Sequence, residues 1–176
     1  MHLRLATRED IPALSGLITQ SAQALSQGYY TPQQITAAIT YVFGVDTQLI
    51  DDGTYWVMED DAQPIGCGGW SFRKTLYGGN QMKESEDPRL DPATDPARIR
   101  AFFVHPGQAR RGIGAKLLER CLSEASAAGF QTIELMATLP GVPFYEVYGF
   151  APCESVATTL PDGTELPFVR MARSLS

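Results

Sequence analysis

One segment of the sequence constrains the fold more than any other. A predicted strand, Ile99–Val104, runs into a basic, glycine-rich loop, and a helix follows at once, from near Gly112 to just before Gly129. The apolar face of this helix recurs at steps of three and four residues, through Ile113, Leu117, Cys121, Ala125 and Ala128. Backbone N–H groups in such a loop, together with those at the helix start, form a concave binding site for phosphate oxygens.

The loop itself excludes two common nucleotide-binding classes. Arg110 and Arg111 add positive charge, and side chains at Gly112 or Gly114 would hold phosphates away from the backbone. A Walker loop needs Lys and then Ser or Thr after its second glycine, and neither follows Gly112. A dinucleotide fingerprint needs a third glycine where Leu117 stands. The loop therefore predicts a different kind of phosphate ligand.

The remaining patterns give the element order βααβββαβαββ, which predicts a mixed α/β domain with one central sheet flanked by helices, in a single domain over residues 1–176. Thr7 with Asp10, and Thr31 with Pro32, mark two helix starts. Predicted strands are 3–5, 54–59, 64–72, 99–104, 132–138, 156–160 and 166–171, and predicted helices are 7–25, 31–44, 112–128 and 143–149. The glycine-, proline- and acid-rich stretch 74–96 predicts a loop, which is either a lid or a solvated excursion.

Composition limits the partners of the chain. Fourteen Lys and Arg against twenty Asp and Glu give a net charge of −6, which argues against a nucleic-acid binder. The sequence has no apolar run of about 18 residues, and its start lacks the core of a signal peptide. Cys67, Cys121 and Cys153 lack metal-ligand spacing and predict buried thiols in a reducing compartment. We therefore expect a cytoplasmic protein with no nucleic-acid, membrane or metal partner.

A second motif, FYEVYGF at Phe144–Phe150, follows the loop with a predicted strand between them. Together with Val104-His105-Pro106 and RRGIG at 110–114, it resembles the signature motifs of the GNAT superfamily of N-acetyltransferases. The predicted element order also matches that fold along nearly the whole chain. The resemblance implies the GNAT-type acyl-CoA N-acyltransferase fold and an acetyltransferase enzyme.

The resemblance further implies acetyl-coenzyme A (acetyl-CoA) as co-substrate and no metal. Its pyrophosphate would lie on the backbone amides of 110–115, and its pantetheine arm would pair with a strand edge that the family frees by splaying its two central strands. A backbone N–H at that edge would polarise the thioester carbonyl. Ala109 stands where the family often has Gln or Arg, and Gln108 stands one residue early, so we expect weakened but not abolished binding. The implied cofactor-binding residues are Phe102, Phe103, Val104, Arg110, Arg111, Gly112, Ile113, Gly114 and Ala115.

Tyr145 matches the family's tyrosine that donates a proton to the departing thiolate. A phenol has a pKa of about 10 and a thiol of about 8.5, so Tyr145 would mainly supply a hydrogen bond at the sulfur. Its alternative role is packing in a short helix. An attacking amine must be neutral, yet residues 98–102 carry no acid. Glu134, Glu59 and a chain of waters remain as candidate proton acceptors.

Several functional alternatives stay open. The acceptor is an unidentified amine of a small molecule or peptide, attacked directly in a ternary complex. One alternative is a non-catalytic acyl-CoA sensor or interaction module. The others are transfer to a thiol or hydroxyl acceptor and transfer of a longer acyl chain. Homodimers are common in such folds, although no stretch predicts one.

Four other side chains are interpreted structurally. We expect His105 to fix the turn before Pro106, Cys67 to be a packed thiol beside small residues, and Trp56 and Trp70 to pack in the hairpin. An alternative places Trp70 with Tyr29 and Tyr30 in the wall of an acceptor pocket.

Overall fold

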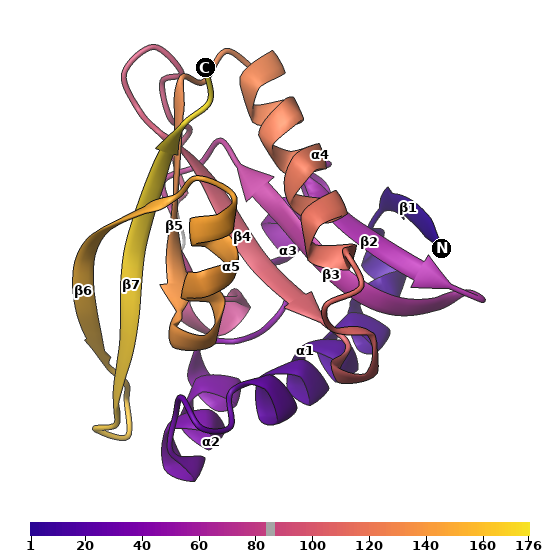
Figure 1. Ribbon diagram of the computed structural model, residues 1–176, viewed down its shortest axis with the longest axis vertical. Coiled ribbons are helices and arrows are strands. Elements are labelled where there is room, and N and C mark those ends of the chain that lie inside the picture. Colours follow the sequence, from indigo (N-terminus) through magenta and orange to yellow (C-terminus); the bar gives the residue numbers. More distant parts are fainter. Residues whose placement is uncertain (84–86) are drawn as a thin grey trace.

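The strands of the chain build one sheet with helices on both of its faces (Figure 1). The computed structural model describes residues 1–83 and 87–176, and within them seven strands pair in the order β1-β2-β3-β4-β5-β7-β6. The strands are β1 (His2–Leu5), β2 (Tyr55–Asp60), β3 (Gln63–Ser71), β4 (Ala97–Val104), β5 (Thr132–Thr138), β6 (Ala151–Thr159) and β7 (Glu165–Ser174). The helices are α1 (Ile11–Leu25), α2 (Pro32–Tyr41), α3 (Thr47–Asp51), α4 (Ile113–Ala127) and α5 (Val142–Val147), with 3-10 turns at Arg8–Asp10, Asn80–Met82, Pro106–Gln108 and Leu139–Gly141.

This architecture confirms the predicted mixed α/β sheet. Thr31 caps α2 as predicted, because its Oγ1 accepts a hydrogen bond from the Gln34 backbone N–H at 3.1 Å. The sequence analysis does not predict α3, a short helix that Asp46 caps by accepting from the Gln48 N–H at 2.9 Å. It also begins β6 too late, because the exposed residues at the start of that strand show no apolar alternation.

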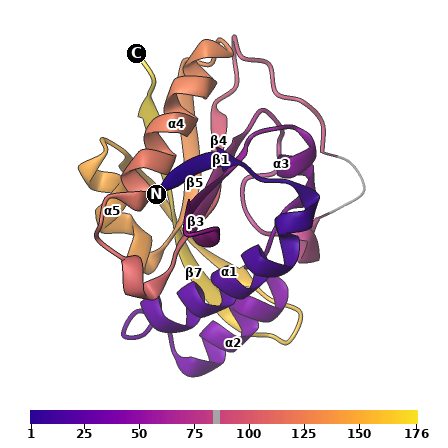
Figure 2. The same ribbon diagram turned by 90° about the vertical axis from the view of Figure 1, so that its right-hand side faces the viewer.

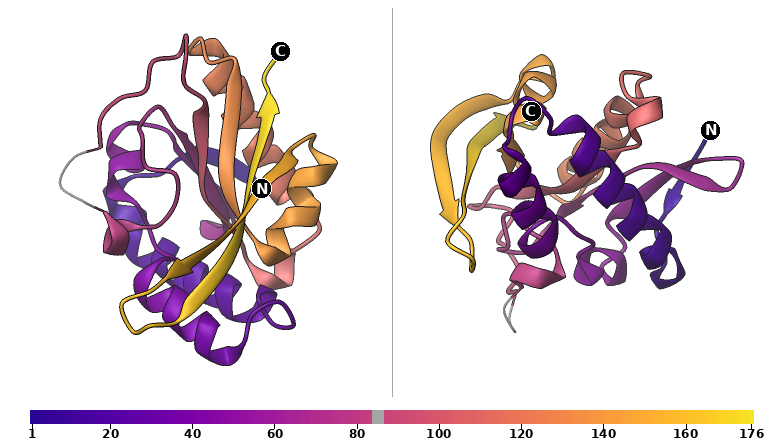
Figure 3. Two further views of the ribbon diagram at one scale, coloured as in Figure 1. Left: turned by 90° about the vertical axis from the view of Figure 1, so that its left-hand side faces the viewer. Right: turned by 90° about the horizontal axis from the view of Figure 1, so that it is seen from below.

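Apolar layers cover both faces of the sheet. On one face, α1, α2 and α3 pack against Tyr55, Val57 and Phe168. On the other, α4 and α5 pack against strand residues that include Ile99 and Ile133. Figure 2 shows the two groups of helices on opposite sides of the strands. Figure 3 shows the β6–β7 hairpin reaching α2, where the Gln34 side chain donates to the Glu165 carbonyl at 3.0 Å.

The central strands β4 and β5 pair over a short length only. Their parallel pairing joins Ala97 with Ile133 and Arg98 with Glu134, and toward their C-terminal ends the strands separate. Ion pairs close the paired end, since Glu134 lies 2.6 Å from Arg98 and 3.3 Å from Arg170 on β7. This separation confirms the splayed strands that the family resemblance implies.

A bend in β4 contributes to the separation. Ala101 has a φ of 52°, and the fully buried Tyr55 donates its hydroxyl to the Ala101 carbonyl at 2.7 Å. On β3, a Cβ at Gly68 would lie 2.5 Å from the Phe102 ring, so only glycine admits this close approach. The neighbouring Cys67 is a fully buried thiol, as predicted.

The three cysteines do not all have the predicted environment. Cys67 and Cys121 are buried, but Cys153 is exposed. The prediction is wrong for Cys153 because this residue lies on the edge strand β6, whose first residues are exposed. In the described parts of the chain, no helix has the length and apolar character needed to cross a bilayer.

Removing the hydroxyl that holds the bend should destabilise the protein. Tyr55→Phe leaves the partly buried Ala101 carbonyl without this partner, so we expect the free energy of unfolding to fall by about 1–3 kcal/mol. Denaturant unfolding measures it. Tyr29→Phe, at a residue that is 51% exposed, is the control and should change it by less than about 0.5 kcal/mol. Equal stability of the two variants would show that the bend does not depend on Tyr55.

Candidate active site

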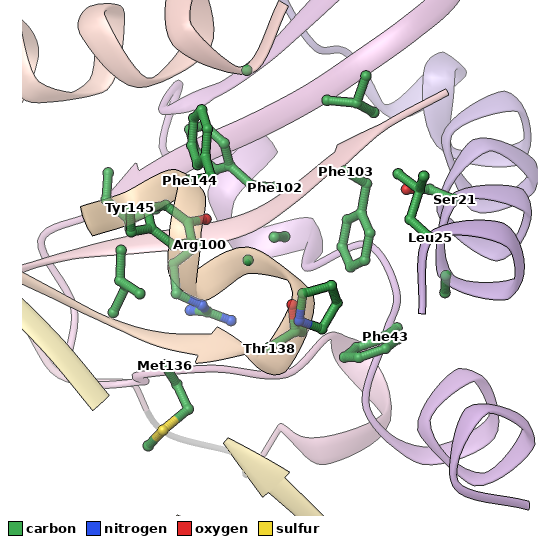
Figure 4. A pocket seen from close by; sticks show the side chains of 18 of the residues that line it. Ser21, Leu25, Phe43, Arg100, Phe102, Phe103, Met136, Thr138, Phe144 and Tyr145 are labelled. Carbon is green, nitrogen blue, oxygen red and sulfur yellow. The ribbon is translucent and has the colours of Figure 1, made fainter. Parts of the chain in front are cut away.

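A cavity of about 600 Å³ opens where β4 and β5 separate. This volume lies within the usual range for a small-molecule site. One end is lined by the β4–α4 loop, the start of α4, and α5. The other end is lined by α1, residues 42–44, residues 76–79 and strand β7, and the splayed strands β4 and β5 contribute to both ends. We call these the donor end and the acceptor end, and Figure 4 shows side chains that line both.

The donor end contains the start of α4. Arg110 and Gly112 have φ values of 62° and 81°, and α4 begins at Ile113. Left-handed residues in such a loop turn successive N–H groups toward one side, and the first N–H groups of the helix lack intrahelical partners. This geometry suits a site for an anion, and the phosphate-binding role of the loop stays a prediction.

The two glycines of this loop have different structural roles. Gly112 needs its positive φ, and a Cβ built there meets nothing within 4 Å, so the space above it is free for a ligand. A Cβ on Gly114 would lie 3.2 Å from the Phe144 ring. Gly114 therefore lets α4 and α5 approach closely, in addition to keeping the loop open.

The cavity gathers most of the predicted cofactor-binding residues. Its lining includes Phe102, Phe103, Val104, Arg110, Gly112, Ile113, Gly114 and Ala115. Arg111 lies outside the lining, because its side chain donates to the Gln108 side chain at 2.5 Å on the surface of the loop. Ala109 does line the cavity, so the departure from the family pattern falls at the site itself.

Tyr145, on α5, also lines the cavity. Its ring makes edge contacts with Phe144 and Phe150 at centroid distances of 5.1 and 5.6 Å, and Figure 4 shows its hydroxyl directed into the cavity. Burial raises the pKa of Tyr145 above its ordinary value, with a smaller effect from Cys121. The phenol therefore stays protonated near neutral pH and is available as a donor.

Neither candidate carboxylate reaches the cavity. Glu134 binds Arg98 and Arg170 at the closed end of the splay. Glu59 lies on β2 and pairs with Arg4 at 3.1 Å. Both carboxylates are absent from the cavity lining and are held by guanidinium groups.

Arg100 is a site residue that the sequence analysis does not identify. It lines the cavity although only 2% of it is exposed, and its Nη2 lies 3.0 Å from Asp46 Oδ2 and donates to the Gly78 carbonyl at 2.5 Å. Lys83 also contacts Asp46, at 2.7 Å. No sequence motif joins these residues, because they come from β4, the α2–α3 connection and the loop after β3.

These contacts fix part of the segment 74–96 as a wall of the cavity. Tyr77 donates to or accepts from Thr158 at 2.7 Å, and the Gln81 side chain donates to the Phe43 carbonyl at 2.9 Å. Residues 76–79 thereby line the acceptor end. The predicted loop 74–96 also includes residues 84–86, which lie outside the described residues.

The other interpreted side chains are mostly structural. His105 Nδ1 accepts from the Gly107 N–H at 3.0 Å and so fixes the turn, as predicted. Trp56 and Trp70 donate to the Glu124 side chain on α4, at 3.1 and 2.8 Å.

The proposed aromatic wall of the acceptor pocket is only partly right. Tyr29 lines the cavity, but Trp70 does not, because it packs on the α4 face. Tyr30 is not in the lining either; its hydroxyl donates to the Pro167 carbonyl at 2.7 Å and accepts from the Leu139 N–H at 3.0 Å.

Comparison with known families identifies the class. A family model described as an acetyltransferase (GNAT) domain matches residues 51–152, which is more than half of the chain. The fold, the cavity and this match define an acetyltransferase enzyme. The chain belongs to the GNAT superfamily of N-acetyltransferases. Among the described residues, no cluster of His, Cys, Asp and Glu has the arrangement of a metal site.

Solved structures share the fold at low sequence identity. A GCN5-related N-acetyltransferase from Rhodopseudomonas palustris has a TM-score of 0.72 and 17% identity, over 98% of this chain and 94% of that one. The PaiA N-acetyltransferase from Thermoplasma acidophilum, solved with coenzyme A, has a TM-score of 0.65 and 14% identity, over 98% of both chains. The ribosomal-protein-S18-alanine N-acetyltransferase from Escherichia coli has a TM-score of 0.60 and 15% identity, over 99% and 94%. Sequence comparison with curated proteins finds no significant match.

Substitution of Gly112 should test the anion site. Gly112→Leu places a side chain in the open space above the loop and strains a residue at φ 81°, so we expect coenzyme A affinity to fall at least about tenfold, by calorimetry. Gly163→Leu is the matched control, because Gly163 has a φ of 86°, equally open surroundings and a place in the β6–β7 turn. Both variants should lose similar stability, and only the first should lose affinity. Equal affinities would contradict the assignment of the loop.

Proposed function

We propose that the protein transfers an acetyl group from acetyl-CoA to an amine of a small molecule or peptide, by direct attack in a ternary complex. The observation that carries this proposal is one continuous cavity that joins the α4 anion site, the free edge of β4, Tyr145 and an apolar second end. A donor entering from the α4 side and an acceptor entering from the other would meet between the splayed strands.

The donor would be held mainly by backbone groups. The N–H groups of residues 110–115 would bind the pyrophosphate, which the positive φ values of Arg110 and Gly112 and the open space above Gly112 support. The β4 edge at Phe102–Val104 would pair with the pantetheine arm, since β5 leaves that edge unpaired there. A backbone N–H near Phe103 or Val104 would then stabilise the oxyanion.

Tyr145 would hydrogen bond to the sulfur as it leaves. Its protonated phenol, raised in pKa by burial, suits a donor rather than a base. Direct transfer is favoured over a covalent acyl-enzyme, because burial raises the pKa of Cys67 to about 12 and Cys67 does not line the cavity. Cys121 lies on α4 and is likewise fully buried outside the lining.

The chain would act as one domain over residues 1–176, in the cytoplasm. A non-catalytic acyl-CoA sensor is the second candidate, favoured by the absence of a carboxylate from the cavity lining among the described residues. Tyr145 and the open glycine loop favour the enzyme, as does membership of the acetyltransferase family.

Removing the Tyr145 hydroxyl should slow turnover more than it weakens donor binding. We expect Tyr145→Phe to lower kcat by about 10- to 100-fold, with the affinity for acetyl-CoA changed by less than about threefold, because the hydroxyl acts on the leaving sulfur. Tyr148→Phe, at the other tyrosine of the same helix end, is the control. Steady-state kinetics and calorimetry measure the two quantities. Full activity of Tyr145→Phe would leave Tyr145 a packing residue.

Acetyl transfer should release free thiol from acetyl-CoA in the presence of some amine. A panel of arylamines, alkylamines, polyamines and peptides, followed with a thiol reagent, tests this directly. We expect at least one acceptor to raise thiol release well above hydrolysis, and mass spectrometry to find its acetamide. If no amine of the panel raises thiol release while the protein still binds coenzyme A, the result would favour the non-catalytic module.

A further inference from the structure

The acceptor end of the cavity is lined by apolar and aromatic side chains. These include Leu25, Phe43, Tyr77, Phe103, Met136 and Phe168. Two aromatic pairs stand there: Phe43 meets Phe103 edge-on at 5.6 Å, and Tyr77 meets Phe168 at 5.2 Å between ring centroids. Rings arranged in this way favour contact with a further aromatic ring. These side chains therefore favour an apolar, aromatic acceptor.

The ionisable groups of the lining are phenols and guanidinium groups. Within the described residues they are Tyr29, Tyr77, Arg100, Arg110, Tyr145 and Tyr148. At neutral pH such groups are neutral or positive. Nη2 of Arg100 pairs with Asp46 and donates to the Gly78 carbonyl. The buried Nε of Arg100 has no hydrogen-bond partner in the described structure. The lining thus offers an ammonium group no described carboxylate, and the buried charge in it is the Arg100 guanidinium, which Asp46 pairs.

The same lining limits how a proton leaves the acceptor. An alkylamine arrives mostly as ammonium and needs a base before it can attack. Burial raises the pKa values of Tyr145, Tyr55 and Cys67, which keeps these three groups protonated. Glu134 and Glu59 are held in ion pairs away from the cavity.

We infer that the acceptor is a weakly basic amine bonded directly to an aromatic ring, which is already neutral when it binds. This inference rests on the proposed acetyltransferase function. The nitrogen lone pair forms the new C–N bond, the C–S bond breaks, and its electron pair goes to sulfur. Tyr145 hydrogen bonds to that sulfur, and the proton that the nitrogen loses once it is acylated ends on the thiolate. The products are the N-aryl acetamide and free thiol, with no net proton change and no separate base.

Two acceptors that differ by one methylene test the inference. The probes are para-toluidine and para-methylbenzylamine, assayed with saturating acetyl-CoA between pH 6 and 9. We expect kcat/KM at pH 7 to be at least tenfold higher for para-toluidine and constant with pH. For para-methylbenzylamine it should rise about tenfold per pH unit, following the neutral fraction of the free amine.

A matched pair of variants places a carboxylate in the cavity. Thr138 lines it near Tyr145, since a Cβ on Gly141 would lie 3.2 Å from Thr138 Oγ1 and 3.3 Å from the Tyr145 ring (Figure 4). Thr138→Asp and Thr138→Asn are isosteric, and both residues suit the helix-start position of Thr138. We expect Thr138→Asp to raise the para-methylbenzylamine to para-toluidine ratio of kcat/KM at least tenfold at pH 7. Thr138→Asn should leave that ratio unchanged.

The outcomes separate this inference from the function on which it rests. Equal use of both amines by the wild type at pH 7, or a pH-independent rate with the benzylamine, would overturn it by revealing a base. Thiol release with polyamines or peptides but with neither probe would also overturn it and leave the acetyltransferase function intact. No release with any amine, while coenzyme A binds, would refute both. If Thr138→Asp and Thr138→Asn have the same para-methylbenzylamine to para-toluidine ratio of kcat/KM, the result would count against the argument that the missing carboxylate selects the acceptor.

Discussion

The separation of β4 from β5 is the constraint on which the rest of the site depends. A parallel pair in mid-sheet normally continues its hydrogen bonds, yet here pairing stops after two residue pairs. Glu134 ties Arg98 to Arg170 at the closed end, and the Tyr55 hydroxyl holds the bend at Ala101 farther along. Unpaired backbone and a cavity of about 600 Å³ follow from these few contacts.

The buried Arg100, next to the bend in β4, also contributes to the charge of the cavity. β4 places Arg100 where its guanidinium is almost completely enclosed, and Asp46 and the Gly78 carbonyl supply the partners that a buried charge requires. The arrangement ties the central strand to the loop after β3. Arg100 therefore fixes this wall of the cavity, and the lining holds no carboxylate among the described residues.

The donor end could be predicted from the sequence because it is contiguous. The strand, the glycine loop and the helix after it occupy residues 97–127 without interruption, and their local chemistry determines their geometry. Even there, the sequence does not distinguish the roles of the two glycines. Gly112 is required by its positive φ, and Gly114 by the close approach of the Phe144 ring. Arg111 shows the limit as well, because its side chain pairs with Gln108 and lies outside the cavity lining.

The acceptor end could not be predicted because tertiary contacts assemble it. Leu25, Phe43, Tyr77, Met136 and Phe168 come from five separate parts of the chain, and each one is ordinary core material in its own sequence context. Only packing shows that these side chains face one space. A contiguous motif can thus conserve the chemistry of the donor while changes at scattered positions alter the acceptor. The charged groups at that end decide which protonation state the acceptor must have. Carboxylates that form ion pairs elsewhere in the fold are not available near the reacting nitrogen.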